Sequence, residues 1–431
     1  MNQLNICVAG LGNVGSNLIL TLEENSKLIK QKASVSFNIL AVSAKKQNKK
    51  RTFNTNSYKW CENPLDLIKI SNCHVLIELI GEEKGISFEI VKKALENKIH
   101  VVTANKALLA INGFELFQIA EQNNVMLLFE AAVAGGIPII NTLKNSLFLN
   151  QIKKLKGILN GTTNFILSEM EQKNLSFDEV LKNAQLNGYA EIDPTNDIEG
   201  LDAAHKLTLL SSICFCSEIN FNNNEISGIN GIHIDDILNA KKLGYKIKLI
   251  SETSIINNQI ACVTEPKLIR IDNPLANVNG VLNAINIETD QLKNLFLEGE
   301  GAGGKATASS VIADLFIISS NSNTLSLGHK TSKLKAYKKF SSLDIKSSFY
   351  MRIMTKDITG VLSKITSYFN ESGISIEKIL QLPESINKNT PIPIIITTHE
   401  VEKNLLINAI RQIEKLDFIL EKINIITIDK N

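Results

Sequence analysis

The fold is decided near the start of the chain, where residues 4–15 read LNICVAGLGNVG. Residues 4–9 form a short apolar run rich in branched side chains, which predicts a buried strand. The glycine-rich turn follows, and apolar residues at helical spacing come next. A strand, a G-x-G-x-x-G turn and a helix in this order are typical of a Rossmann unit, whose helix N-terminus binds the pyrophosphate of a dinucleotide. The cofactor-binding residues predicted in this turn are Gly10, Gly12, Asn13, Val14 and Gly15.

Further apolar runs continue the α/β pattern. The expected strands cover residues 37–42, 75–79, 101–103 and 125–130. A helix is expected over residues 87–96, with Ser87 as its N-cap. Ligands of open α/β sheets bind outside the carboxyl ends of the strands, so Thr103 and Lys106 are expected in the active-site crevice. For Lys106 the alternative is an ordinary lysine at the start of a helix.

The second expected strand ends without a carboxylate. A site selective for NAD usually has an acidic residue there, which holds the ribose 2′-hydroxyl. Here Ser43 and Lys45 follow the strand. Further cations follow at Lys46, Lys49, Lys50 and Arg51. A serine and several cations suit a 2′-phosphate, which favours NADP(H) over NAD(H), although a solvated basic surface loop is the competing interpretation.

A second informative stretch covers residues 187–206, which read NGYAEIDPTNDIEGLDAAHK. Asp202 and Lys206 lie four residues apart and therefore project from one face of a helix. Glu191 lies in the turn before Pro194. A loop carboxylate, a helix carboxylate and a helix lysine can converge on one pocket, which suits a small substrate with an ammonium group and a hydroxyl. The alternative is an exposed Asp–Lys pair worth ~0.3–0.5 kcal/mol beside a polar loop.

The segment after the fourth expected strand, EAAVAGGIPII at residues 130–140, allows two interpretations. Gly135 and Gly136 allow backbone carbonyls to turn inward. Together with Glu130, such carbonyls can hold a hard cation such as Na⁺, which takes oxygen ligands. From these residues alone, a tight hinge between domains is the simpler interpretation.

Taken together, the motifs resemble the homoserine dehydrogenase family, in its long form with a C-terminal regulatory module. Besides GLGNVG they are TANK (103–106), EAAVAGGIP (130–138), LNGTTNFIL (159–167), the 187–207 segment and GEGAGGKATASSVIADL (299–315). They occur in the family's order over nearly the whole chain. Glu300 and Ala306 replace prolines that the family usually has, and His205 stands where another residue is common. These departures remove no group that the chemistry needs.

The resemblance implies reversible, NAD(P)H-dependent reduction of L-aspartate 4-semialdehyde to L-homoserine, in the biosynthesis of threonine, methionine and isoleucine. Lys206 then resembles the acid/base on the reacting oxygen, and Lys106 helps to polarise that oxygen. Glu191 and Asp202 would bind the ammonium end of the substrate, while Gly188 and Gly303 would border the cofactor. The family's sodium site matches Glu130, Val133, Gly135 and Ile137. A homodimer or homotetramer is also implied.

Two other functions compete with this one. A non-catalytic amino-acid sensor would keep the folds but lose part of the set Lys106, Glu191, Asp202 and Lys206, all of which are present. A dehydrogenase with a cysteine nucleophile needs a cysteine at a strand end with a histidine partner. The six cysteines are scattered and suggest no such pair. The lysine-dependent enzyme is therefore favoured.

The tail from residue 349 is expected to be a separate unit. The expected strands and helices, in chain order, are residues 349–354, a helix within 357–373, 374–382, 392–398 and a helix at 403–416. The predicted order βαββαβ is ferredoxin-like. The D-x-x-G-V-L turn at 357–362 resembles an ACT domain, which binds amino acids at a pair interface near the turn that Gly360 occupies. Threonine is the implied effector, and a dimerisation module without a ligand is the alternative.

The expected fold class is α/β, with several domains. The layout is a Rossmann-type NAD(P)-binding domain (1–137 plus 302–320), an α+β substrate and dimerisation domain (138–301), a linker (321–348) and a ferredoxin-like ACT domain (349–431). A net charge of +2 without a basic, aromatic-rich face argues against a nucleic-acid partner. No apolar run approaches the ~20 residues of a membrane span. The absence of a signal-peptide pattern and the scattered cysteines predict a cytoplasmic protein.

Overall fold

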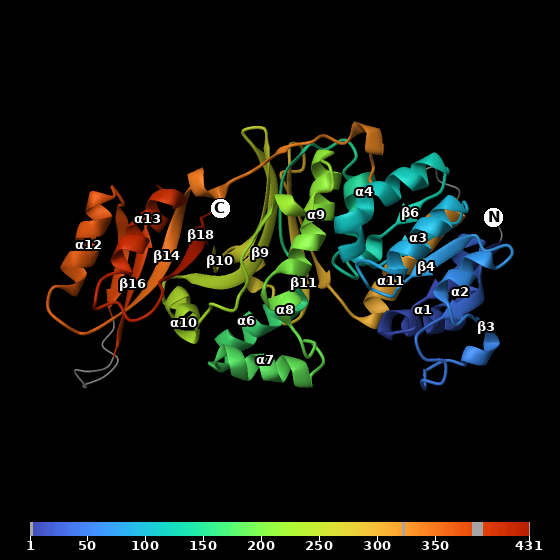
Figure 1. Ribbon diagram of the computed structural model, residues 1–431, viewed down its shortest axis with the longest axis horizontal. Coiled ribbons are helices and arrows are strands. Elements are labelled where there is room, and N and C mark those ends of the chain that lie inside the picture. Colours follow the sequence, from blue (N-terminus) through green and yellow to red (C-terminus); the bar gives the residue numbers. More distant parts are fainter. Residues whose placement is uncertain (1–2, 321–323, 382–390, 431) are drawn as a thin grey trace.

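The computed structural model describes residues 3–320, 324–381 and 391–430. These residues form two sheets, which follow one another along the long axis of the molecule (Figure 1). The first sheet has six strands, and the second has twelve. The N-terminal α/β domain lies at one end, a helix-covered sheet lies in the middle, and the C-terminal unit lies at the other end (Figure 1).

The N-terminal sheet is parallel throughout, with the strand order β3-β2-β1-β4-β5-β6. Its strands are β1 (Gln3–Ala9), β2 (Ser36–Ser43), β3 (Lys59–Trp60), β4 (Val75–Glu78), β5 (His100–Thr103) and β6 (Leu127–Leu128). Parallel strands with helices on both faces are buried on both sides, which explains their apolar runs. The predicted Rossmann-type domain is thereby confirmed.

Five helices of the described chain cover this sheet. They are α1 (Asn13–Glu24), α2 (Ser26–Ala33), α3 (Ile86–Glu96), α4 (Lys106–Gln122) and α11 (Gly304–Ser319). Helix α11 comes from far along the chain, and it packs against α1. The chain therefore returns to the nucleotide domain after building the central sheet, through a helix that lies within the segment 302–320 assigned to this domain from the sequence.

Two local predictions in this domain are wrong. The N-cap of α3 is Gly85, with φ +68°, rather than Ser87. The Ser87 hydroxyl is buried and donates to Glu78 Oε1 at 3.1 Å, so it serves a buried carboxylate instead of a helix end. The strand expected over residues 125–130 is only the short β6, because the chain turns into a 3-10 helix at Glu130–Ala132.

The central part of the second sheet has the order β12-β11-β7-β9-β10 and is antiparallel. Its strands are β7 (Ile152–Ile158), β9 (Tyr245–Ile256), β10 (Gln259–Arg270), β11 (Leu282–Thr289) and β12 (Asn294–Glu300), and β8 (Asn224–Ile226) pairs with β10. The helices here are α5 (Ile139–Asn141), α6 (Gly161–Lys173), α7 (Phe177–Leu186), α8 (Thr195–Ile198), α9 (Leu201–Phe215) and α10 (Ile234–Lys242). Helix α9 packs against α4, β9 and β10, so it is buried along most of its length.

The C-terminal unit has the predicted βαββαβ order. Its main elements are β14 (Lys346–Thr355), α12 (Val361–Glu371), β15 (Ile376–Gln381), β16 (Ile392–Thr398), α13 (Lys403–Ile413) and β18 (Asn424–Asp429), with the short β17 (Val401–Glu402) beside β14. The strand order is β18-β14-β16-β15. Leu382, which was expected to end β15, lies outside the described residues.

The C-terminal unit and the central domain share one sheet. Strand β18 pairs in parallel with β10, with Lys267 opposite Thr427. The short β13 (Lys338–Lys339), inside the segment expected to be a linker, also pairs with β10. None of the helices formed by the described residues combines the length and apolar character needed to cross a bilayer.

Candidate active site

Two cavities lie on either side of the glycine turn between β1 and α1. The larger, 1230 Å³, is bordered by Gly10 and Gly12 and by the end of β2 at Ser43. The smaller, 550 Å³, begins at Asn13 and Val14 and extends between the N-terminal domain and the central domain. A dinucleotide that lies across the turn therefore reaches both cavities.

The three glycines of the turn have separate structural roles. Gly10 has φ +104°, and a Cβ there would lie 2.4 Å from the Leu79 carbonyl oxygen. A Cβ on Gly15 would lie 2.1 Å from the Gly10 carbonyl oxygen, so this position allows the helix to pack on the turn. A Cβ placed on Gly12 would meet no atom within 4 Å beyond its chain neighbours, and no side chain caps α1. The helix N-terminus is thus open to the pyrophosphate of a nicotinamide dinucleotide, and the residues fit that group.

The end of β2 carries the residues that were predicted to meet a 2′-phosphate. The Ser43 hydroxyl is buried and has no hydrogen-bond partner among the described residues. Lys45 is exposed and pairs with Glu82 at 3.1 Å. The Arg51 guanidinium donates to backbone carbonyls of the loop 46–49 at 2.6–3.1 Å, and its Nε has no partner in the described chain. All three residues line the larger cavity.

Asp202 joins two lysines in the smaller cavity. Its Oδ2 lies 2.6 Å from Lys206 Nζ, and its Oδ1 lies 3.2 Å from Lys106 Nζ. Lys206 also donates to the Leu159 carbonyl at 2.7 Å. Lys206 and Asp202 lie on α9, whereas Lys106 begins α4, so the packing of these two helices brings the three charges together. The sequence predicted this convergence for the pair on α9.

The electrostatics of the cluster favour the charged forms of Asp202 and Lys106. Burial alone would raise the pKa of Asp202, but the ammonium groups of Lys206 and Lys106 outweigh it and hold that pKa below its usual value. In return, the Asp202 carboxylate raises the pKa of Lys106 above that of free lysine. Asp202 thus holds two ammonium groups together in the cavity, where they can stabilise an oxygen that gains negative charge.

Asn160 and Asp197 belong to the cluster, although the sequence had assigned them no role. The Asn160 amide donates to Asp197 Oδ1 at 2.7 Å and to Asp202 Oδ2 at 2.8 Å. Its Oδ1 caps α6 by accepting from the Thr163 N–H. Burial and the neighbouring Asp202 raise the pKa of Asp197. Asn160 lies in the LNGTTNFIL motif. Its place between a strand and the start of a helix is the sequence feature that could have identified it as a site residue.

The other predicted residues are placed as follows. Gly188 and Gly303 both have positive φ values and line the smaller cavity. Thr103 is buried, and its hydroxyl donates to Glu78 Oε2 at 2.6 Å. It is not among the residues that line the cavity. Glu191 is exposed and is not among the residues that line the cavity, but its charge contributes to the raised pKa of Lys106.

The predicted sodium ligands already take part in protein hydrogen bonds. Both carboxylate oxygens of Glu130 accept from backbone N–H groups of α5 at 2.8 Å, and burial raises its pKa to about 7. The Gly135 carbonyl accepts from the Ser310 hydroxyl at 2.6 Å, and the Ile137 carbonyl accepts a backbone N–H at 2.7 Å. The buried Val133 completes the predicted set. The described ranges contain no cluster of three or more acidic, His or Cys side chains that could hold a metal ion.

Comparison with known proteins gives one consistent family. The profile described as "Homoserine dehydrogenase, NAD binding domain" matches residues 10–130, and the profile "Homoserine dehydrogenase" matches residues 138–316. A homoserine dehydrogenase of Neisseria gonorrhoeae is 38% identical over 100% of this chain and 99% of its own length. These matches cover both the nucleotide domain and the central domain.

Solved structures agree with these sequence matches. A homoserine dehydrogenase structure from Thiobacillus denitrificans superposes with a TM-score of 0.90 at 35% identity, covering 99% of this chain and 98% of that one. A hyperthermophilic archaeal homoserine dehydrogenase mutant in complex with NADPH covers 74% of this chain and 98% of its own, with a TM-score of 0.60 and 26% identity. The chain is an NAD(P)-dependent oxidoreductase and belongs to the homoserine dehydrogenase family.

Proposed function

We propose that the chain reduces L-aspartate 4-semialdehyde to L-homoserine, reversibly and with NADPH as the preferred cofactor. When bound, the nicotinamide supplies or accepts the hydride, and the protein positions it. The observation that carries the proposal is the Lys206–Asp202–Lys106 cluster in the cavity that opens beside the glycine turn. An aldehyde oxygen placed at this cluster meets two cations as it gains negative charge.

Lys206 is proposed as the proton donor. Its ammonium is held by the Leu159 carbonyl and Asp202, which leaves a further N–H to point at the aldehyde oxygen. A lysine in this position supplies both charge stabilisation and the proton for the new hydroxyl. In the reverse direction a neutral lysine must remove that proton, and free lysine titrates near ~10.4. Oxidation of homoserine is therefore expected to favour alkaline pH.

Asp197 is proposed as the group that binds the substrate's ammonium end. It lines the cavity, and its raised pKa reflects a buried carboxylate beside another carboxylate. A substrate ammonium placed there would relieve that repulsion. Asp202 is already shared between two lysines and Asn160, so it is better suited to orienting Lys206. Glu191, which is exposed and acts electrostatically on Lys106, would add a second carboxylate when the substrate is bound.

The experiment that tests this function measures NADPH and NADH oxidation with L-aspartate 4-semialdehyde. Turnover that requires the semialdehyde, together with homoserine as the product, supports the proposal. A protein that binds the cofactor and amino acids without turnover would instead be the sensor that competes with it. The intact lysine cluster argues against that alternative, because a sensor needs no proton donor.

We further propose that residues 349–431 are an ACT-type regulatory unit and that threonine lowers activity through it. The support is the βαββαβ order and the turn at Gly360, which has φ +90°, begins α12 and has open space around it. The resemblance also supports a homodimer or homotetramer, a structural Na⁺ and a place in threonine, methionine and isoleucine synthesis. It supports the same domain boundaries as the sequence analysis. Adding millimolar threonine to the assay tests the regulatory part, and an unchanged rate would leave the unit a structural module.

A further inference from the structure

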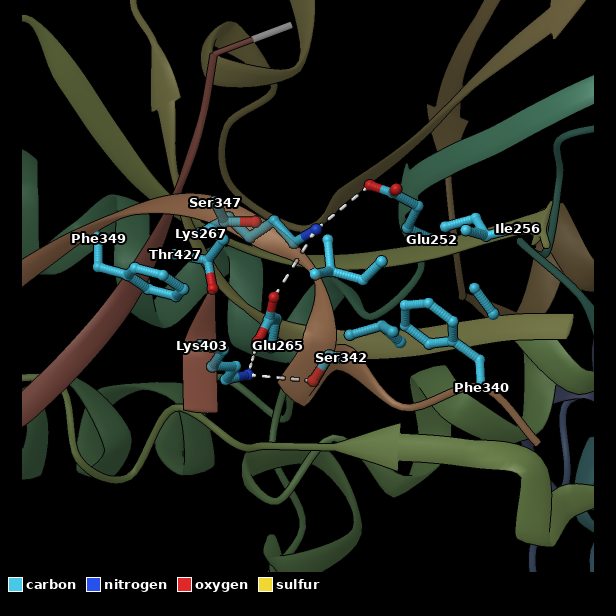
Figure 2. Close-up of a pocket in the computed structure, with 13 residues that line it drawn as sticks. Glu252, Ile256, Glu265, Lys267, Phe340, Ser342, Ser347, Phe349, Lys403 and Thr427 are labelled. Atoms are coloured by element: carbon cyan, nitrogen blue, oxygen red, sulfur yellow. Dashed lines mark hydrogen bonds and ion pairs between the residues drawn. The ribbon is translucent and has the colours of Figure 1, made fainter. Parts of the chain in front are cut away.

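A third cavity, separate from the two at the glycine turn, lies at the seam between the central domain and the C-terminal unit. It has a volume of 110 Å³ and lies beside the joint between β10 and β18. Its walls come from β9, β10, residues 340–347, β14, α13 and β18 (Figure 2). A water molecule needs roughly 10–15 Å³ of such space, so the seam cavity has room for a small organic molecule.

Charges of both signs line the seam cavity in equal number. Glu252 and Glu265 supply two carboxylates, and Lys267 and Lys403 supply two ammonium groups. These side chains are largely buried, with at most a quarter of each exposed. Dashed contacts in Figure 2 join Glu252, Lys267, Glu265 and Lys403 in an alternating row of acid and base, and another joins Lys403 to Ser342.

The ion pairs that border the seam cavity are long, whereas those next to it are short. Lys267 lies 3.2 Å from Glu252 and 3.7 Å from Glu265, and Lys403 lies 3.3 Å from Glu265. Charge-assisted N–H···O bonds usually measure about 2.7–2.9 Å. Behind the wall, Lys154 forms a 2.6 Å pair with the lining residue Glu252, and Lys156 forms a 2.6 Å pair with Asp429. The longer contacts between the lining groups themselves are therefore the ones that a ligand can exchange for its own charges.

The rest of the wall restricts the chemistry of that ligand. Hydroxyl groups are supplied by Ser342, Ser347 and Thr427. The apolar wall consists of Ile256, Ala261, Val263, Phe340, Ile345 and Phe349. The two carboxylates and two ammonium groups already balance one another, so a simple anion or a simple cation would leave the cavity with an excess of one charge. A small molecule with one ammonium, one carboxylate and a short side chain matches both signs, the hydroxyls and the apolar wall.

We propose that the seam cavity binds a small zwitterionic α-amino acid. Its carboxylate lies against Lys403 and the Ser342 hydroxyl, which are 3.5 Å apart, and its ammonium lies against Glu252 and Glu265. This site is distinct from the turn at Gly360, because Gly360 is not among the residues that line the cavity. A ligand in this position joins the central domain to the C-terminal unit directly.

The position of the seam cavity also connects it to the catalytic helix. Next to Glu252 on β9, the Thr253 hydroxyl lies 2.9 Å from the hydroxyl of Ser211 on α9. The same helix carries Asp202 and Lys206. An amino acid that fixes β9 and β10 against the C-terminal unit can change the rate only if its affinity differs between two arrangements of the sheet. Binding of an amino acid in the seam cavity does not depend on the proposed reaction, whereas an effect on the rate does.

The test is calorimetry on the full-length protein without cofactor, with L-threonine and L-alanine as probes. Propionate and propylamine serve as probes with a single charge. The variants are Lys403→Met and Glu265→Gln, with Lys403→Arg to restore the charge. Lys430→Met is the matched control, because Lys430 pairs with Glu377 at 2.9 Å on the surface of the same unit. Circular dichroism verifies that each variant is folded.

The expected result is binding of at least one amino acid by the wild type and by Lys430→Met. Affinity should fall at least tenfold in Lys403→Met and Glu265→Gln, and Lys403→Arg should recover most of it. Three results would overturn the proposal: no heat with either amino acid, wild-type affinity in both cavity variants, or equal affinity for propionate or propylamine. Failure of the reaction assay with intact binding would reject the proposed function alone.

Discussion

The Asp202 carboxylate lies 2.6 Å from the Lys206 ammonium, one turn further along α9. Both side chains are about nine-tenths buried, so the pair is neither a surface contact nor free to reorient. A buried ion pair contributes little net stability, because desolvation offsets the attraction. Its value here is geometric, since Asp202 fixes the direction in which Lys206 presents its proton.

Lys206→Ala is therefore expected to abolish turnover while cofactor binding persists. General acid catalysis typically contributes ~10²–10⁴-fold, and the loss should be at least of that size. Initial rates measure the loss, and quenching of NADPH fluorescence measures cofactor binding. Lys206→Arg should fail as well, because a guanidinium does not release its proton at these pH values. Near-normal rates in Lys206→Ala would reject the assignment.

Asn160→Asp is expected to lower kcat/KM at least tenfold, and the loss should grow with pH. The change keeps the acceptor that caps α6 but replaces a donor to Asp197 and Asp202 with a third carboxylate. Clustered carboxylates raise one another's pKa, so repulsion increases as they ionise. A pH series of steady-state rates measures this. Asn63→Asp, at the N-cap of a 3-10 helix in the N-terminal domain, is the matched control, and an equal effect there would contradict the account.

The contrast between Asp202 and Asn160 indicates what the sequence can predict. Asp202 and Lys206 share a helix face, so their spacing alone brought them together. Asn160 meets carboxylates 37 and 42 residues later in the chain, and only the packing of α6, α8 and α9 creates that contact. The glycine turn was recognisable because each glycine meets a local steric need. Thr103 was placed in the crevice by its strand position, but its hydroxyl is used by Glu78.

The strand pairing that joins the two domains could not be predicted from the sequence either. Strands β10 and β18 pair with each other, yet nothing in the local sequence of either strand specifies this pairing. The segment before β14 looked like a linker because it is polar. In the structure its β13 adds to the sheet, and Ser342 N–H donates to Glu225 at 3.0 Å. Pairing over long sequence distances depends on the assembled core, which no short window of sequence contains.

Arg51→Leu is expected to reduce kcat/KM for NADPH about tenfold or more, a loss of ~1.4 kcal/mol, with a smaller effect for NADH. Arg51 shapes the basic loop by donating to its carbonyls and adds positive charge beside Ser43. Only NADPH carries the 2′-phosphate that this charge would meet. Kinetics with both cofactors measure the change. Lys69→Met, at an exposed surface pair, is the control, and equal losses for both cofactors would show that Arg51 serves the fold instead.

Asp429→Ala is expected to destabilise the protein by ~3–5 kcal/mol, because it leaves the buried Lys156 without its partner. The two side chains are 6–7% exposed and lie 2.6 Å apart across the joint between the domains. Glu377→Ala removes one partner of an exposed pair in the same unit and should cost ~0–1 kcal/mol. Urea unfolding measures both. Equal losses of unfolding free energy in the two variants would mean that this pair does not stabilise the joint. A chain truncated before β14 also lacks Asp429, so it should be destabilised because Lys156 again loses its partner.

Lys248 provides a test that depends on pH. Its ammonium is 1% exposed and is held by neutral oxygens, with the Val278 carbonyl at 2.6 Å and Asn164 Oδ1 at 3.0 Å. Burial lowers its pKa to about 7, with a smaller contribution from Lys246 and an opposing one from Glu171. In the unfolded chain a lysine titrates near ~10.4.

The sign of the effect follows from proton binding. Below pH 7 Lys248 is charged in both states, and the cost of burying that charge is present in full. From about pH 7 to ~10.4 the unfolded chain binds more protons than the folded one, so this residue makes the free energy of unfolding rise with pH. Lys248→Met removes that contribution. The wild type should therefore gain stability relative to the variant by up to ~1.4 kcal/mol per pH unit over this range. Urea unfolding of both proteins from pH 7 to 10 measures the difference, with Lys241→Met, at an exposed position of α10, as a control for removing a lysine. Parallel pH profiles for the wild type and Lys248→Met would mean that Lys248 stays charged, held by the oxygens of α6 and the loop before β11.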